Sequence, residues 1–291
     1  MARRARALTT TGASRASRSA RRIARLPAQW ALATRFRQLL RRRINFDELR
    51  GIPDADALAI VVCLWNRPGR LADVLRIVDA QQSSRRLRLI LWNNDPHQRE
   101  HYRSTIAGFT PQGALDSVEF FNSPTNIGGM GRFVAARELV TRGYSGPYLM
   151  MDDDQDFSPT FVEDLLASAH PGSFAGVWAW NNNGAYWNRT QVQTSGASAD
   201  HVGTGGSICD SALLTDKTFF TAIPIRFLFM EDIWMSHYVR RNGGQLTMVS
   251  SPFEFTLSEL DQGHALFDYK EDFYRWLQQP ARIPLRASGV V

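Results

Sequence analysis

Four short apolar runs, each ending at polar or turn-forming residues, constrain the fold of this 291-residue chain more than any other feature. The first, Leu58–Trp65, is rich in β-branched residues, which is typical of a strand buried on both faces of a sheet. A turn signal, Asn66-Arg67-Pro68-Gly69, follows it directly. The sequence predicts three further strands, at Leu87–Trp92, Val118–Phe121 and Tyr148–Met151.

Helical patterns lie between and after these strands. Apolar residues recur at helical spacing in three segments, Leu71–Ala80, Gly131–Leu139 and Phe161–Ser168. The alternation predicts an α/β fold with an open, mostly parallel sheet flanked by helices. After Gly172 the composition favours a smaller mixed region of short strands and long loops, followed by a helix at Ile233–Arg241 and a strand at Leu246–Val249.

Polar residues follow the ends of all four predicted strands. Ligands of open α/β sheets bind beyond the carboxyl ends of the strands, so we expect these polar residues to surround a binding site. They are Asn66 and Arg67, Asn93 to Asp95, Asn122, and Asp152 to Asp154.

The last of these groups is a cluster of acids, with Asp156 close behind the Asp152–Asp154 triplet. Adjacent like charges repel unless a cation is bound. Mg²⁺ and Mn²⁺ prefer oxygen ligands and bridge carboxylates to substrate phosphates. Because alternate residues of an extended chain point the same way, Asp152 and Asp154 are expected to share one cation. A solvated acidic loop is the alternative.

A glycine-rich segment, Asn126–Arg132, precedes the predicted helix at Gly131–Leu139. Glycine allows close backbone approach, and helix N-termini attract anions. Arg132 is expected to add a charge-assisted bond to a phosphate. The segment matches neither the P-loop nor the dinucleotide fingerprint, and an ordinary loop remains an alternative.

The positive charge is concentrated at the N-terminus. The net charge is +6, yet residues 1–50 hold fourteen arginines and two acids, a net charge of +12, which leaves −6 on the remainder. We therefore predict a basic, partly disordered arm at 1–50 with an amphipathic helix between residues 23 and 44, a catalytic domain at 51–275 and a tail at 276–291.

The role of this arm is left open by its composition. It could contact anionic lipid headgroups, remain a solvated tail or pack on the body, act as a transit peptide, or bind nucleic acid. The sequence has two distant cysteines, no apolar segment of the secretory type and no apolar stretch of about 18 residues. These features predict a cytoplasmic protein. Peripheral contact with the inner face of the membrane is a second option.

Several of these motifs, in this order, resemble the inverting glycosyltransferases of family 2, which have the GT-A fold. The resemblance spans about residues 57–265. Its motifs are Leu64–Arg67, Asn93–Asp95, Asn126–Gly129, Asp152–Asp154, Gly205-Gly206 and Glu231-Asp232. The run Asn126–Pro159 is most similar to bacterial galactofuranosyltransferases that build cell-wall polymers.

The resemblance implies a role for each matching residue. Asp232 would be the general base, because an inverting transfer needs a carboxylate to take the acceptor's proton. Mn²⁺ or Mg²⁺ would be held by Asp152, Asp154 and a histidine, for which His264 is favoured over His237. The expected donor-binding residues are Asn66, Arg67, Asn94, Asn126, Gly128, Arg132 and Asp153, and the acceptor-binding residues are Trp180, Trp187 and Glu231.

The function implied is metal-dependent transfer of a sugar from a nucleoside-diphosphate sugar, with UDP favoured as the nucleotide, to a hydroxyl of a glycan or glycolipid. Asn93-Asn94-Asp95 departs from the commoner Asp-Asn/Gly-Ser form of this loop. The resemblance therefore does not establish how the loop would contact the nucleobase of the donor. A nucleotidyltransferase is the alternative enzyme. A nucleic-acid-binding protein that uses the arginine-rich arm is disfavoured by the negative net charge of the body.

Overall fold

The computed structural model describes residues 27–256 and 266–279. The chain forms two compact units, Met1–Arg42 and Arg43–Val291. In the first unit the described residues form a helix over 27–41, within the segment expected to be helical. Its contact with anionic lipid stays a prediction. None of the helices in the described ranges is both long and apolar enough to cross a membrane.

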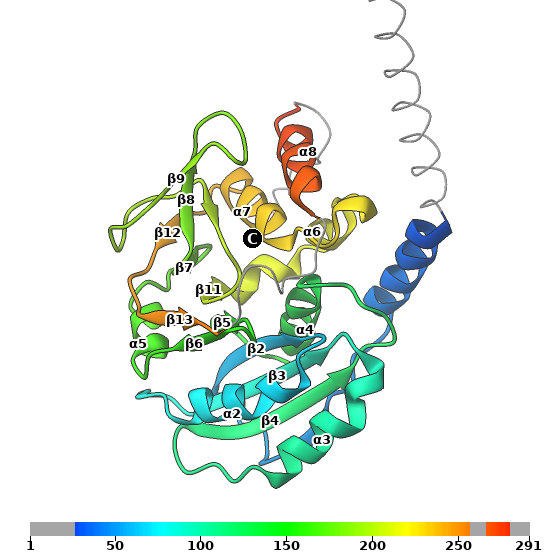
Figure 1. The fold of residues 1–291 in the computed structure, drawn as a ribbon, viewed down its shortest axis with the longest axis vertical. Helices are drawn as coiled ribbons and strands as arrows, with labels where there is room; N and C mark the ends of the chain where they lie inside the picture. Colours follow the sequence, from blue (N-terminus) through cyan, green and yellow to red (C-terminus); the bar gives the residue numbers. More distant parts are fainter. Residues whose placement is uncertain (1–26, 257–265, 280–291) are drawn as a thin grey trace, which may run out of the picture. The chain divides into compact units, whose positions relative to one another are not determined.

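An eight-stranded sheet organises the second unit (Figure 1). Its strand order is β1-β4-β3-β2-β5-β11-β7-β12. Six of these strands run in one direction, whereas β1 and β11 are antiparallel to their neighbours. The strands are β1 (Asp47–Arg50), β2 (Leu58–Leu64), β3 (Leu87–Asn93), β4 (Leu115–Asn122), β5 (Pro147–Met151), β7 (Phe174–Gly176), β11 (Ser207–Asp210) and β12 (Leu246–Met248).

Helices cover both faces of this sheet (Figure 1). On β2, Leu58, Ile60, Val62 and Leu64 share a core with the apolar face of α2. The intervening residues of β2 point to the opposite face, against α4. The helices are α2 (Leu71–Asp79), α3 (Arg99–Gly108), α4 (Met130–Thr141), α5 (Phe161–Leu166), α6 (Lys217–Thr221), α7 (Glu231–Arg241) and α8 (Phe267–Leu277). Four 3₁₀ segments are η1 (Pro68–Arg70), η2 (Pro96–Gln98), η3 (Ser211–Thr215) and η4 (Ile225–Phe227).

Two small sheets complete the fold, as expected for the mixed region. One contains β10 (His201–Val202), β8 (Ala179–Asn182) and β9 (Arg189–Gln191), and the other pairs β6 (Gln155–Phe157) with β13 (Phe253–Phe255). The second pair joins the residues just after the acidic triplet to a strand about one hundred residues later in the chain.

The carboxyl ends of the central strands meet at one edge of the sheet. Leu64 of β2 is in register with Asn93 of β3, and Asn93 with Asn122 of β4. Val62 is likewise in register with Met151, which directly precedes the acidic triplet. The ends of β2, β3, β4 and β5 therefore lie at one edge of the sheet, as expected for parallel strands.

Three features differ from the expectations. Strand β1 lies inside the segment assigned to the arm, because residues 47–50 pair with β4. Helix α8 runs across the expected start of the tail. Helix α3 was not expected, because its sequence is mostly polar and buries Tyr102 and Ile106 as a single i, i+4 pair.

Two glycines with positive φ offer a test of packing at the sheet edge. Gly206 has φ +79°, and a Cβ there would lie 2.8 Å from both Phe157 and Val177. Gly143 has φ +99° and open space around it. We expect Gly143→Ala to lower the free energy of unfolding by about 1–2 kcal/mol through backbone strain, and Gly206→Ala to cost a further 1–3 kcal/mol, roughly, through overpacking. Urea unfolding of both variants measures the difference, and equal losses would contradict it.

Candidate active site

A pocket of about 410 Å³ opens at the carboxyl edge of the sheet. The loops after β2, β3 and β5 form one side of it. The start of α4, the β8–β10 sheet, the start of α7 and Lys270 of α8 form the rest. Segments that are far apart in the sequence therefore share one cavity, whose lining contains carboxylates, guanidinium groups and aromatic rings.

The acidic triplet forms a tight turn between β5 and β6. Residues 153 and 154 are the turn residues, so the chain is not extended there. The argument from alternating side chains was therefore wrong, although all three aspartates line the pocket. Their charge is compensated by two arginines. Arg132 donates to Asp152 at 2.7 Å, and Arg67 lies 2.7 Å from Asp153 and 3.3 Å from Asp154.

Burial and mutual repulsion disturb these carboxylates. Burial raises the pKa of Asp153 to about 6, even though Arg67 opposes the shift. The pKa of Asp154 is also raised, by burial and then by the negative charge of Asp152. The two arginines therefore do not fully offset the cost of placing three carboxylates in one turn.

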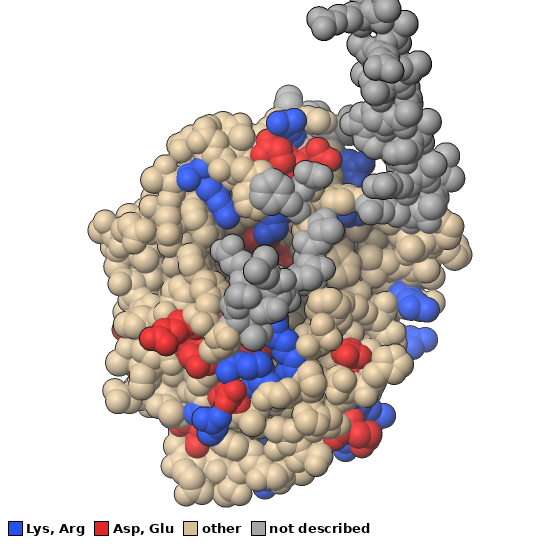
Figure 2. All heavy atoms as spheres, in the orientation of Figure 1, with Lys and Arg blue, Asp and Glu red and all other residues tan. Residues whose placement is uncertain are grey.

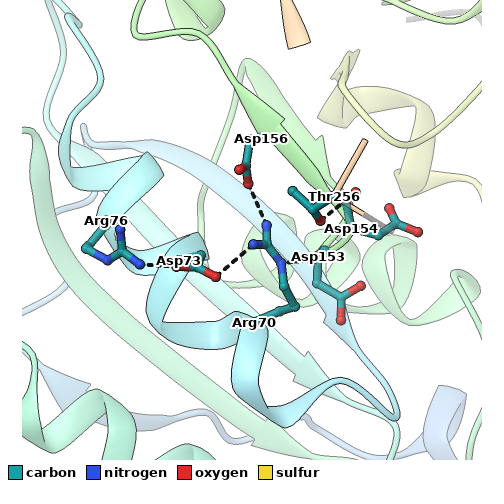
Figure 3. A network of polar contacts seen from close by, with 7 residues as sticks. All are labelled: Arg70, Asp73, Arg76, Asp153, Asp154, Asp156 and Thr256. Carbon is teal, nitrogen blue, oxygen red and sulfur yellow. Dashed lines mark hydrogen bonds and ion pairs between the residues drawn. The ribbon is translucent and has the colours of Figure 1, made fainter. Parts of the chain in front are cut away.

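The Arg70 guanidinium forms hydrogen bonds to the outer side of this turn (Figure 3). Its Nε donates to the backbone oxygen of Asp153 at 2.9 Å, and its two terminal nitrogens donate to Asp156 at 2.6 Å and Asp73 at 2.7 Å. From the other side, the amide and hydroxyl of Thr256 both donate to the backbone oxygen of Asp154. The turn is thus held by groups from two distant parts of the chain.

The loop before α4 is shaped by asparagine side chains. Asn94 accepts from the Ile127 amide at 3.1 Å and donates to the Gly128 oxygen at 3.1 Å. Asn126 accepts from the Gly128 amide at 2.8 Å. Both asparagines line the pocket, but these amide groups are engaged in holding the loop.

Glycines in two loops let carboxylates approach the backbone. A Cβ on Gly129 would lie 1.8 Å from Oε1 of Glu231, and one on Gly205 would lie 2.2 Å from Oδ2 of Asp152. Any side chain at either position would displace a carboxylate that lines the pocket. The glycine-rich segment therefore has a steric role beside the acids, in addition to preceding a helix N-terminus.

Glu231 and Asp232 begin α7 and have opposite electrostatic surroundings. Burial raises the pKa of Glu231 to about 7, although Arg132 opposes the rise. Burial also disfavours charge on Asp232, but Lys270 and His201 outweigh it and hold its pKa well below the ordinary value. His201 Nε2 lies 3.4 Å from Asp232 Oδ2. Asp232 is therefore ionised at neutral pH, whereas Glu231 keeps its proton to a higher pH than an ordinary glutamate does.

Aromatic rings form the wall beside Asp232. Trp178 and Trp180 are stacked with centroids 5.5 Å apart, and the stack continues to His201 at 5.5 Å and to Phe255 at 5.4 Å. The Arg189 guanidinium lies 4.2 Å from the Trp180 ring centroid. Such a wall offers apolar ring faces and edges to a sugar.

The pocket gathers most of the residues expected from the sequence. Arg67, Asn94, Asn126, Gly128, Arg132, Asp152, Asp153, Asp154, Trp180, Glu231 and Asp232 all line it. Asn66 is exposed with φ 57° and is not among the lining residues, and Trp187 lies outside the pocket with 39% of its surface exposed. His264 falls outside the described residues, and His237 borders a different cavity.

The sequence analysis missed several lining residues, among them His201, Thr204, Arg189 and Lys270. Thr204 donates to Glu231 at 3.3 Å. His201 and Lys270 influence the ionisation of Asp232 from distant points in the sequence. No local motif marks these positions; only the Gly205-Gly206 motif next to Thr204 gave a nearby signal.

The donor set suits a hard divalent cation that is completed by substrate oxygens. Asp152 and Asp154 supply carboxylates from one turn, and Mg²⁺ is commonly bound by one or two carboxylates together with phosphates. Within residues 27–256 and 266–279, no three or more His, Cys, Asp or Glu side chains form a ready-made metal cage. Any cation here would share Asp152 with Arg132 and Asp154 with Arg67.

Comparison with known proteins found likeness at the level of structure only. No family model matches the chain, and no curated protein matches it in sequence. The crystal structure of residues 1–349 of TarS, a glycosyltransferase from S. aureus, matches with a TM-score of 0.44 and 17% identity. The match covers 67% of this chain and 58% of the TarS chain, so this chain spans little more than half of that length.

Removing the Arg70 guanidinium should loosen the acidic turn. Arg70→Met deletes three charge-assisted donors, and we expect the free energy of unfolding to fall by about 2–4 kcal/mol. Arg76→Met is the matched control, because Arg76 is 67% exposed and pairs with Asp73 alone; its loss should cost less than about 1 kcal/mol. Urea unfolding compares the two, and equal effects would show that Arg70 holds nothing in place.

The raised pKa of Glu231 predicts a pH-dependent stability. The folded state binds this proton more tightly than the unfolded state, so the free energy of unfolding should fall as pH rises from about 4.5 to 7. Glu231→Gln should remove this contribution and leave the variant more stable than wild type at pH 8, by up to about 3 kcal/mol.

Unfolding curves at pH 5, 6, 7 and 8 measure that slope. Glu100→Gln, at an exposed carboxylate of α3, controls for the loss of one negative charge. Asp153 contributes its own slope up to about pH 6 in every variant. An unchanged slope in Glu231→Gln would refute the assignment.

Proposed function

We propose that the chain is an inverting glycosyltransferase that moves a sugar from a nucleoside-diphosphate sugar to a hydroxyl of a glycan or glycolipid. The observation that carries the proposal is the division of the pocket into two parts. The acidic turn with Arg67 and Arg132 lies at the strand ends, and the ionised Asp232 lies beside an aromatic wall. One part suits a diphosphate and the other an acceptor hydroxyl.

The donor half combines negative and positive groups that a diphosphate could rearrange. Arg132 is 96% buried, and its Nε and Nη1 have no hydrogen-bond partner among the described residues. Buried guanidinium donors are costly when unpaired and bind phosphate oxygens well. Arg67 is less buried and faces the same turn. We therefore assign the diphosphate to the space between these arginines and the start of α4.

A divalent cation held by Asp152 and Asp154 would supply a further positive charge that stabilises the departing diphosphate. Burial, and after it the neighbouring aspartates, raise the pKa of Asp153 and Asp154, and a bound cation would favour the ionised form of these carboxyls. Mn²⁺ or Mg²⁺ is the expected ion. A UDP-sugar is the favoured donor, and galactofuranosyl transfer into a cell-envelope polysaccharide is one specific form of the proposal.

Asp232 would act as the base. The acceptor hydroxyl gives its proton to the Asp232 carboxylate while its oxygen forms a bond to the anomeric carbon. The bond between that carbon and the diphosphate oxygen breaks, and the diphosphate leaves with the electron pair. Lys270 and His201 keep Asp232 ionised before the transfer, and Trp180, which lines the pocket, would orient the acceptor ring.

Surface charge favours this reading over nucleic-acid binding. Figure 2 shows Lys and Arg interspersed with Asp and Glu on the face in view, among the residues that are described. Arg67 and Arg70 are each paired with an aspartate. Paired cations of this kind do not form the basic stripe that binds a phosphate backbone.

A panel of UDP-, GDP- and dTDP-sugars with Mn²⁺ tests the proposal. Purified protein should hydrolyse or transfer the sugar of at least one donor. Asp232→Asn should lower kcat by about 10²–10⁴-fold while donor Kd is retained. Asp154→Ala should instead abolish the dependence of donor binding on Mn²⁺.

Asp272→Asn is the matched control, because it removes an exposed carboxylate on α8 outside the pocket. Its turnover should equal that of wild type. Full turnover in Asp232→Asn would eliminate the base assignment, and a panel with no reactive or bound donor would eliminate the proposed function.

A further inference from the structure

A second cavity, of about 460 Å³, adjoins the first. Its volume lies within the range of about 300–1,000 Å³ that is common for ligand sites. It is lined by residues of α7, α8 and the end of β8, and α7 and α8 are neighbours in Figure 1. The lining includes Ser236 and His237 from α7, Tyr274 from α8, Gln278 directly after α8, and Asn182 from β8.

Helix α7 links this cavity to the proposed base. Asp232 in its first turn lines the first pocket. Ile233, Ser236, His237 and Arg240 follow at spacings of three and four residues and line the second cavity. Residues at that spacing share one helix face, so the second cavity runs along α7 away from the base. Tyr186 and His201 border both cavities and mark their junction.

The second cavity contains both hydrogen-bond donors and hydrogen-bond acceptors. The Asn182 side-chain oxygen and His237 Nε2 are buried and have no hydrogen-bond partner among the described residues. Burial, together with Arg241 and Arg240, lowers the pKa of His237 to about 4, so its ring is neutral at pH 7. A neutral imidazole and an amide can each bond a hydroxyl in either sense.

One ion pair and two aromatic rings also line this cavity. Arg240 and Asp200, both lining residues, form an ion pair at 2.7 Å. The Tyr186 and Tyr274 rings, with centroids 6.5 Å apart, add aromatic surface. Arg241 also lines the cavity. Hydroxyl-bonding groups beside aromatic rings suit a sugar ring, which presents hydroxyls at its edge and apolar C–H groups on its faces.

We propose that this second cavity binds the next sugar residue of an acceptor glycan, the residue adjoining the one whose hydroxyl reaches Asp232. The inference rests on the proposed function for the direction of the acceptor. It adds a specificity: the site recognises at least two linked sugar residues. Asn182 and His237 are the residues that hydrogen-bond the second sugar residue.

The test measures binding by the full chain without a donor. The probes are gluco-, galacto-, manno- and N-acetylglucosamine oligosaccharides of one, two and three residues, titrated by calorimetry and by saturation-transfer NMR. For at least one series, we expect the two-residue probe to bind more tightly than the one-residue probe. Asn182→Ala and His237→Ala should each weaken the two-residue probe by about three- to tenfold, and leave the one-residue probe unchanged.

Arg275→Ala is the control, because Arg275 is exposed on α8 and lines neither cavity. Affinity that does not depend on probe length, equal binding by Asn182→Ala, His237→Ala and wild type, or no binding by any series overturns the proposal. Length-dependent binding that both variants lose, in a protein inactive toward every sugar nucleotide, would keep the second cavity as a glycan site and reject the transferase. A protein that turns over a donor but binds probes without length dependence would keep the transferase and reject the second cavity as a glycan site.

Discussion

The confinement of five carboxyl groups around one pocket is the constraint on which the rest of this structure depends. Asp152, Asp153 and Asp154 occupy one turn, and Glu231 and Asp232 begin a helix that faces it. Repulsion among them is offset by cations that the fold holds in place: Arg67, Arg132 and Lys270. The compensation is uneven, since Asp232 is held ionised while Glu231 and Asp153 have raised pKa values. As a result, Asp232 stays charged without a ligand, whereas the ionised forms of Glu231 and Asp153 could still be stabilised by a bound cation.

The sheet makes this arrangement possible. Parallel strands bring their carboxyl ends to one edge, and the register of β2, β3 and β5 aligns the polar residues that follow them. Helices α4 and α7 both begin at that edge, so their first turns contribute Arg132, Glu231 and Asp232. Gly129 and Gly205 leave the space that two of the carboxylates occupy. Strand ends, helix starts and missing side chains thus act together to bring opposite charges into one cavity.

The sequence was most informative where the signal is local. Strands such as Leu58–Leu64, the acidic triplet and the glycine-rich segment all follow from apolar runs and short motifs. The turn at 153–154 was not foreseen, because the pairing of β6 with β13 fixes it from about one hundred residues away. His201 and Lys270 carry no motif, and only tertiary packing places them beside Asp232. Asn66 and Trp187 had suitable chemistry and neighbours in sequence, yet neither lines the pocket.

The double hydrogen bond from Thr256 to the Asp154 backbone oxygen has a consequence for biosynthesis. Domains begin to fold while the chain is still being made, at about 5–20 residues per second. The sheet strands up to β5 can pair early, but Thr256 follows Asp154 by 102 residues. The acidic turn therefore acquires its final shape only after most of the chain has left the ribosome. A nascent or truncated product that ends before Thr256 would contain every aspartate of the triplet without its native geometry.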